Sequence, residues 1–214
     1  MLLRNALRAF AFAGLLASAG SVLADAASDF IIAAENDRAG QVRDALAKGI
    51  DPNTVSTIGE PALVVAARAG SAATVDALIA GKANVNAGST AGDTAIMAAA
   101  LSGHLEIVKK LRAAGAQLDP PGWTPLIYAA TGGKDDVVTY LLAQGAKINA
   151  ASPNGTTALM MAVREGKGST VTLLVAKGAD VNVKNQNGAT ALAWAVRGNE
   201  QAMAQALRQA GAKE

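Results

Sequence analysis

A fixed period runs through most of this chain and limits its fold more than any other sequence feature. A tetrapeptide with an apolar third residue recurs near residues 28, 61, 94, 124, 157 and 190. Its clearest copies are Thr94–Met97, Thr124–Ile127, Thr157–Met160 and Thr190–Ala193. The steps are 33, 33, 30, 33 and 33 residues. This period is typical of small supersecondary units that stack, because one unit alone cannot bury its apolar face.

Each unit contains two positions suited to the end of a helix. Nine residues after each start stand Asp37, Gly70, Gly103, Gly133, Gly166 and Asn199. Twenty-one residues after each start stand Gly49, Lys82, Gly115, Gly145, Gly178 and Gly211. Gly, Asn and Asp tolerate the left-handed backbone that ends many helices, so we expect two short helices per unit. Lys82 is the exception, and there we expect a shifted helix end that uses Gly81.

Three further patterns describe the inside of a unit. Apolar residues at helical spacing, such as Val138, Leu141 and Leu142, predict a second helix with one buried stripe. Paired alanines in the first helix, such as Ala99-Ala100, predict close helix packing. A short amide or carboxylate side chain follows each second helix, where it is expected to bond its own backbone in a turn. These residues are Asn53, Asn86, Asp119, Asn149 and Asn182.

With these landmarks, the chain resembles the ankyrin repeat family. Residues 94–116, 122–133 and 157–182 follow its pattern T-P-L-H-x-A-A-x-x-G, then V-V-x-x-L-L-x-x-G-A-D-V-N, and the resemblance extends over 28–214. It implies an all-α solenoid of about six helix–turn–helix repeats with short β-hairpin fingers, in which the first and last repeats act as caps. The histidine that the family places after Leu is replaced by other residues, such as Met97, so we expect apolar packing there.

The first 24 residues are predicted to be an export signal. Arg4 and Arg8 give a basic start, Ala9–Ala19 is an apolar run, and Val22–Ala24 is a cleavable site. Cleavage between Ala24 and Asp25 would leave an ankyrin repeat domain, residues 25–214, in the periplasm or outside the cell. The alternative is an uncleaved amphipathic anchor.

Composition excludes several kinds of chemistry. The chain has no cysteine and a single histidine, so we predict no disulfide, no metal site, no cofactor and no catalytic residue. Removing Arg4 and Arg8 leaves 17 of the 19 basic residues against 17 acidic ones, and this balance does not favour nucleic acid. His104 lies in a Gly-His-Leu-Glu sequence, where the family resemblance implies that it helps to start the second helix. Gly166–Ser169 lacks the spacing of a phosphate-binding loop.

Helical phase predicts which residues meet a partner. Positions four, seven and eight after each start share one face of the first helix, and the family resemblance implies that this face is concave. The candidate partner-binding residues are Arg68, Trp123, Tyr128, Met161, Arg164, Glu165, Trp194 and Arg197. Trp, Tyr and Arg are enriched in interface hot spots, and mixed charges suit a protein surface. The competing interpretation is that Tyr128, Met161 and Trp194 only cover the edges of small-residue helices.

The single step of 30 residues predicts a shortened finger. Residues 115–124 span fewer positions than the other junctions, and Pro120-Pro121 stiffen what remains. We expect a notch in the row of finger tips, with Trp123 at its floor. The alternative is a deletion tolerated in a surface loop.

Together these features predict a non-catalytic protein–protein interaction module that is monomeric and does not insert into a membrane after signal cleavage. Its partner is expected to be a protein held by the concave face and the finger tips. Two roles remain open, an inhibitor or immunity factor and an adaptor or stabiliser. The contrasting function is an enzyme with a groove site that uses Arg164 and Glu165.

Overall fold

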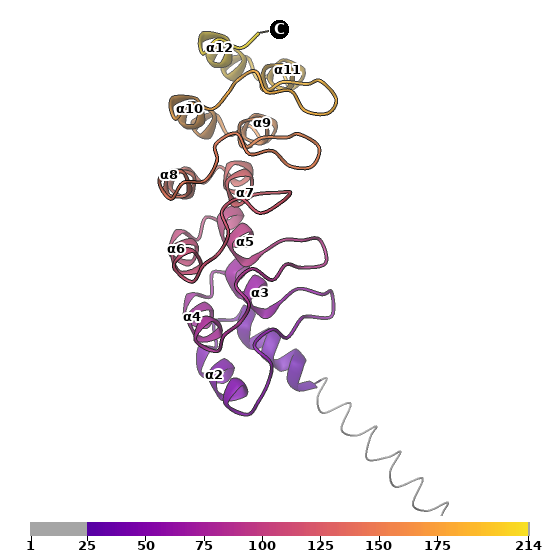
Figure 1. Ribbon diagram of the computed structural model, residues 1–214, viewed down its shortest axis with the longest axis vertical. Coiled ribbons are helices and arrows are strands. Elements are labelled where there is room, and N and C mark those ends of the chain that lie inside the picture. The colour runs from indigo at the N-terminus through magenta and orange to yellow at the C-terminus, as the bar shows by residue number, and fades with distance from the viewer. Residues whose placement is uncertain (1–24, 214) are drawn as a thin grey trace, which may run out of the picture.

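The chain forms an elongated stack of paired antiparallel helices in a computed structural model that describes residues 25–213 (Figure 1). The predicted signal, residues 1–24, lies outside the described residues. A first helix spans residues 25–35. The helices that follow are α2 (Ala39–Ala47), α3 (Ala62–Ala69), α4 (Ala72–Ala80), α5 (Ala95–Ser102), α6 (Leu105–Ala113), α7 (Pro125–Gly132), α8 (Asp135–Ala143), α9 (Ala158–Arg164), α10 (Gly168–Ala176), α11 (Ala191–Arg197) and α12 (Gln201–Gln209).

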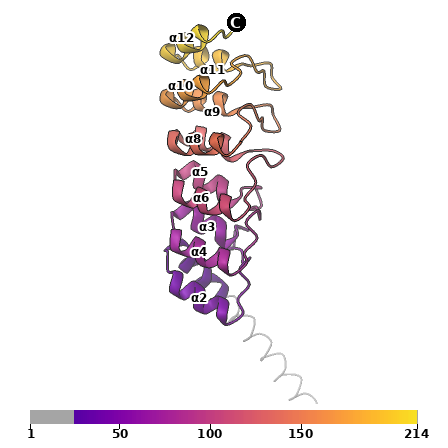
Figure 2. The ribbon, with the colours of Figure 1, turned by 60° about the vertical axis from the view of Figure 1, so that its left-hand side comes forward.

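Two layers of helices build the stack. The odd-numbered helices from α3 to α11 form an inner layer, and the even-numbered helices form an outer layer on the side away from the fingers (Figures 1 and 2). Each inner helix contacts its own outer helix and the inner helices of the adjacent repeats. The predicted all-α repeat solenoid is therefore confirmed. None of the helices in residues 25–213 is long and apolar enough to cross a membrane.

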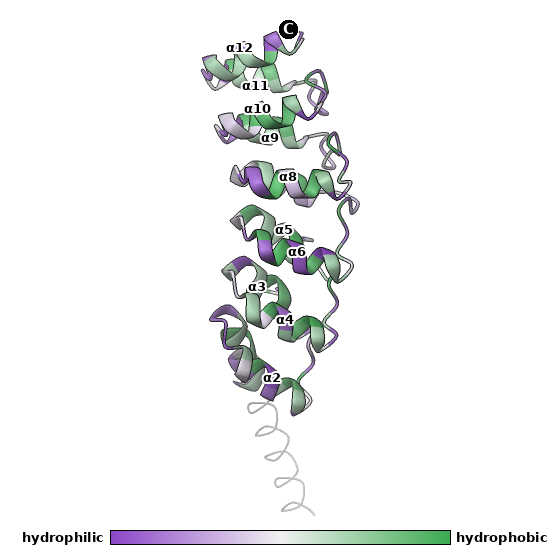
Figure 3. Cartoon of the chain, turned by 90° about the vertical axis from the view of Figure 1, so that its left-hand side faces the viewer, coloured by the Kyte–Doolittle hydropathy of each residue, from purple (hydrophilic) through white to green (hydrophobic). Residues whose placement is uncertain are grey.

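Small side chains let the inner helices approach one another closely. Ala66, Ala67, Ala99, Ala100, Ala129 and Ala130 are all fully buried. The outer helices show polar and apolar stretches along their exposed side (Figure 3). Their apolar stripes, such as Val108 and Leu111 on α6, are buried against the inner layer. Burial in this fold therefore depends on stacking one repeat upon the next, as the period predicts.

The threonine that opens several repeats caps the inner helix. The Thr124 hydroxyl accepts a hydrogen bond from the Ile127 backbone N–H (3.3 Å), and Thr190 accepts one from Ala193 (3.1 Å). Thr157 caps α9 in the same way. A helix begins with unpaired N–H groups, and a threonine at this position satisfies one of them. The third residue of each tetrapeptide is apolar because it faces the core, as Leu126 and Leu159 do.

Among residues 25–213, the amide and carboxylate side chains that follow the outer helices do not bond their own backbone, contrary to the expectation from the sequence, and Asn53 contacts only the Asp51 side chain within its turn. They accept hydrogen bonds at 2.7–3.2 Å from backbone N–H groups of the next repeat. The pairs are Asn53 with Asn84, Asn86 with Gln117, Asp119 with Lys147, Asn149 with Asp180, and Asn182 with Lys213. In three repeats the local turn is made two residues earlier, by Asp51, Asn84 and Asp180. This ladder joins repeats because stacking brings the turns side by side.

The end of α4 also differs from the expectation that it would be shifted to Gly81. The helix end is not shifted to Gly81, whose φ is −74°, and Lys82 itself adopts the left-handed backbone with φ 65°. Gly81 packs closely against α2, because a Cβ there would lie 2.8 Å from Cδ1 of Leu46 and that side chain would have to move. The glycine of this repeat therefore serves helix packing, and the lysine carries the backbone strain.

Replacing Lys82 with Gly is expected to stabilise the protein by about 0.5–1 kcal/mol, since glycine adopts positive φ without a steric cost. Urea unfolding measures the change in the free energy of unfolding. Lys48→Gly is the matched control, because Lys48 ends α2 with φ −85° and has no strain to relieve. An equal gain in both variants would contradict this account.

The fingers are short loops that precede the inner helices. Isolated antiparallel bridges close three of them, Val55 with Pro61, Gly88 with Thr94, and Ala151 with Thr157. Within the described residues no such bridge forms in the loops before α7 and α11, and the loop before α7 is a narrow projection in Figure 1. The predicted shortening of this finger is thus visible in the fold, whereas its functional meaning stays a prediction.

Candidate partner-binding site

A cleft of about 610 Å³ opens on the finger side of the last three repeats. Its walls come from α9, α11 and the loops that precede α7, α9 and α11. The lining residues are Trp123, Asn154, Thr156, Val163, Arg164, Asn185, Asn187, Ala189, Trp194, Arg197, Gly198 and Glu200. The cleft is therefore assembled from segments that lie far apart in the sequence.

Two fingers are joined to form one side of this cleft. The Gln186 backbone N–H donates to the Asn154 carbonyl oxygen (3.0 Å), and the Gln186 side-chain amide donates to the Pro153 carbonyl oxygen (2.6 Å). Gly155 allows this contact, because a Cβ there would lie 2.9 Å from the Cα of Asn185. The two fingers thus hold each other in place beside α9 and α11.

Several predicted binding residues meet in the cleft, namely Trp123, Arg164, Trp194 and Arg197. The two arginines are exposed and the two tryptophans are half-buried. Glu165, which ends α9, does not line the cleft but accepts a hydrogen bond from Nε of Arg164 (3.1 Å). The tertiary structure thus places in one cleft four residues that repeat position and helical phase predicted to lie on one side of the stack.

Met161 is an exception, because its side chain is only 3% exposed and therefore offers no surface to a partner. Val65 and Ala98, at the same repeat position, are also buried. This fourth position points along the stack toward the neighbouring inner helix, so most of its residues are covered. The seventh position points outward, and there Arg68, Arg164 and Arg197 are exposed, among others.

An aromatic cluster lies beside the shortened finger. The rings of Trp123 and Tyr128 pack edge to face, with centroids 6.1 Å apart and an interplanar angle of 74°. The Tyr128 hydroxyl donates to Oδ1 of Asp93 in the preceding repeat. Burial, together with this hydrogen bond, raises the pKa of Tyr128 well above its ordinary value. Tyr128 therefore remains a hydrogen-bond donor, and its ring packs against the Trp123 ring.

Arg68 lies outside the cleft and is held by Glu60. Its guanidinium donates two hydrogen bonds to the Glu60 carboxylate, one of them at 2.8 Å. This hydrogen bonding lowers the pKa of Glu60 below its ordinary value of 4.5 and raises the pKa of Arg68. The Glu60 side chain is 15% exposed and the Arg68 side chain 48%, so solvent screening limits the strength of the pair.

This pair is expected to make stability depend on acid pH. Because the folded-state pKa of Glu60 is lowered, its contribution is present above pH 4.5 and is lost as the pH falls through the folded-state pKa. Between about pH 6 and about pH 3, the wild type should lose about 0.5 kcal/mol more stability than Arg68→Gln. Chemical unfolding at a series of pH values measures this. If the free energy of unfolding depended on pH in the same way in the two proteins, the prediction would be contradicted.

The asparagines of the cleft, Asn154, Asn185 and Asn187, were not predicted from the sequence. A signal for them exists, because Asn154-Gly155 and Asn187-Gly188 are dipeptides that favour tight turns in hairpins. Their positions within the repeats predict that they lie in the fingers. Their side chains line one cleft only because two fingers contact each other.

His104 stands at the N-cap of α6, where the family resemblance places it, and it also links two repeats. It precedes α6 without a side-chain cap, and its Nε2–H donates to the carbonyl oxygen of Arg68 (3.2 Å) at the end of α3. A Cβ on Gly70 would lie 2.8 Å from the His104 ring. The ring thus packs over the end of the preceding inner helix and links two repeats.

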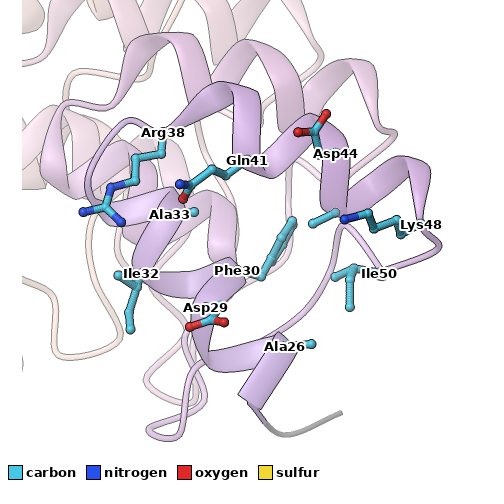
Figure 4. Close-up of a pocket in the computed structure, with 11 residues that line it drawn as sticks. Ala26, Asp29, Phe30, Ile32, Ala33, Arg38, Gln41, Asp44, Lys48 and Ile50 are labelled. Atoms are coloured by element: carbon cyan, nitrogen blue, oxygen red, sulfur yellow. The ribbon is translucent and has the colours of Figure 1, made fainter. Parts of the chain in front are cut away.

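A second cleft, of about 580 Å³, opens at the N-terminal end of the stack between the first helix and α2 (Figure 4). Asp29, Arg38, Asp44 and Lys48 surround the buried ring of Phe30 there. No predicted binding residue lines it. Among residues 25–213, no group of three His, Cys, Asp or Glu side chains is placed to hold a metal ion.

The sequence matches the family model for ankyrin repeats (three copies) over residues 30–121, 63–152, 114–185 and 144–214. These matches together extend from residue 30 to residue 214, and the chain therefore belongs to the ankyrin repeat family. No curated protein matched the sequence. Ankyrin repeats indicate a protein–protein interaction module.

Proposed function

We propose that this chain is an exported, non-catalytic protein that holds a protein partner against its inner helices and fingers. The observation that carries this proposal is the cleft on the finger side of the last three repeats. Trp123, Trp194, Arg164 and Arg197 line it together, and these residue types dominate interface hot spots. A rigid stack presents them on fixed helices and joined fingers, which limits the entropy lost when a partner binds.

Catalysis in the groove has less support. The pair considered for it, Arg164 and Glu165, consists of neighbouring exposed side chains that bond each other. Catalytic acids and bases are commonly tuned by burial or by a nearby charge in a closed site. Recognition is the simpler role for these two exposed groups, of which only Arg164 lines the open cleft.

Capture from an envelope extract tests the proposal. The purified protein should retain a partner, and the double variant Trp123→Ala/Trp194→Ala should bind that partner about 100-fold more weakly, since each truncation removes a hot-spot residue. Tyr140→Ala on the outer helix α8 is the matched control and should bind like the wild type. Full binding by the double variant would contradict the proposed binding surface.

The activity of the captured partner then distinguishes the two roles that remain open. An inhibitor or immunity factor would form a tight one-to-one complex that abolishes the partner's activity. An adaptor or stabiliser would leave that activity unchanged or raise it. Titrating the purified partner with this protein distinguishes the two outcomes.

The export part of the proposal has its own measurement. Protein recovered from the periplasmic fraction should begin at Asp25, as determined by N-terminal sequencing. Full-length protein in the membrane fraction would instead support an uncleaved anchor, and protein confined to the cytoplasm would contradict export.

A further inference from the structure

The cleft of the last three repeats contains more hydrogen-bond donors than acceptors. Arg197 has no hydrogen-bond or ion-pair partner among residues 25–213. Arg164 uses only its Nε, in the contact with Glu165, so its terminal nitrogens remain available. A guanidinium has five N–H donors and no acceptor, and these two groups therefore favour a partner that supplies oxygen acceptors.

The asparagines of the fingers add to this excess of donors. The Asn185 side-chain oxygen accepts from the backbone N–H groups of Asn187 and Ala189, both at 3.0 Å. The Asn154 side-chain oxygen accepts from the backbone N–H of Thr156 at 3.2 Å. Their oxygens are occupied by the turns, whereas their Nδ2 groups have no acceptor in the described part of the chain. The turns thus leave amide donors at the cleft.

The other lining residues determine the net charge of the cleft and supply its apolar surface. Glu200 is the one carboxylate among the lining residues, against the two arginines. The indole rings of Trp123 and Trp194 provide half-buried apolar area, and the hydrogen-bonded Tyr128 supports the first of them. Aromatic area beside cationic groups is suited to a chain that carries both carboxylates and an apolar side chain.

We propose that this cleft, defined by Trp123, Asn154, Arg164, Asn185, Trp194 and Arg197, binds an extended acidic segment of the partner protein. Asp or Glu side chains of the segment contact Arg164 and Arg197, and an apolar side chain lies against the indole rings. The Asn154 and Asn185 amides donate to carbonyl oxygens of the segment. This inference rests on the proposed function and specifies the chemistry of the partner.

Selection from a displayed library of random short peptides tests the proposal with the purified full chain. The selected peptides should be rich in Asp and Glu around an apolar residue, and their affinity should fall at least tenfold when those acids become Asn and Gln. Arg164→Glu/Arg197→Glu should weaken the same peptides by about 100-fold, and higher salt should weaken binding to the wild type. Arg43→Glu, an exposed charge reversal on the outer helix α2, is the matched control and should leave the affinity unchanged.

Several results would overturn the inference. They are failure to select peptides, selection of neutral or basic peptides, equal losses in the cleft and Arg43 variants, and tighter binding of a single-stranded oligonucleotide than of the acidic peptides. Thermal unfolding of every variant shows that any loss of binding is not a loss of folding. If a partner captured from the extract is released by Trp123→Ala/Trp194→Ala but not by Arg164→Glu/Arg197→Glu, the proposed function stands and the acidic segment is wrong.

Discussion

Replacing Gly132 with Ala is expected to destabilise the protein by about 3 kcal/mol, although the same change in most helices is stabilising. Gly132 lies at the end of α7, and a Cβ there would come within 2.3 Å of the Leu101 carbonyl oxygen on α5. Both are backbone-anchored atoms, so the overlap is relieved only by separating two inner helices. Separation removes contacts along the interface between the third and fourth repeats, where the core is built from alanines.

Urea unfolding measures this loss, and amide hydrogen exchange locates it. Exchange should accelerate most in α5 and α7, whose interface is forced apart. Gly40→Ala is the matched control, because Gly40 is a helical glycine of α2 with no atom within 4 Å of its Cβ position. That variant should gain about 0.5 kcal/mol from helix propensity. Wild-type stability of the Gly132 variant would show that the two helices can part without cost.

The second large effect concerns two threonines that occupy the same repeat position but have opposite environments. Thr74 on α4 and Thr170 on α10 are both fully buried. The Thr170 hydroxyl donates to Oδ1 of Asp135 in the preceding repeat (2.5 Å). Among residues 25–213 the Thr74 hydroxyl has no hydrogen-bond partner, because Asp37 in the preceding repeat accepts from the Thr74 backbone N–H instead (2.9 Å).

Valine substitution should therefore change stability in opposite directions. Thr170→Val removes a hydrogen bond to a charged group and leaves Asp135 without this donor, at a cost of about 2 kcal/mol. Thr74→Val removes an unpaired buried hydroxyl at nearly constant shape, and a gain of about 1 kcal/mol is expected. Chemical unfolding of both variants measures the two changes. A shift of the same sign in both would contradict the assignment of the hydroxyl partners.

The fold could be predicted from the sequence because the same local sequence features recur in every repeat. The recurring Thr, the apolar third residue of each tetrapeptide and the paired glycine positions each act within a few residues of one another. Repetition makes each landmark visible several times, so a single irregular copy such as the one at residue 28 does not obscure the pattern. Helical phase likewise placed Trp194 and Arg197 on one side, because both belong to α11.

Contacts between repeats were harder to predict. Met161 was expected on the surface but is buried, since exposure at its position depends on how closely α9 lies to the adjacent inner helices. The asparagine ladder was mistaken for a set of local turns for the same reason. Asn154 and Asn185 were missed because they become neighbours only when two fingers meet.

By itself, the sequence determined that this chain is a stack of helical pairs, where most of the helices end, and on which side its aromatic and arginine side chains are concentrated. Those properties follow from residues less than one period apart, whose geometry the backbone fixes locally. Only the tertiary structure decided which of those side chains remain exposed, which hydrogen bonds join the repeats, and that two fingers close the wall of a cleft. These features depend on the distance and angle between successive repeats, which result from side-chain packing between residues about thirty positions apart.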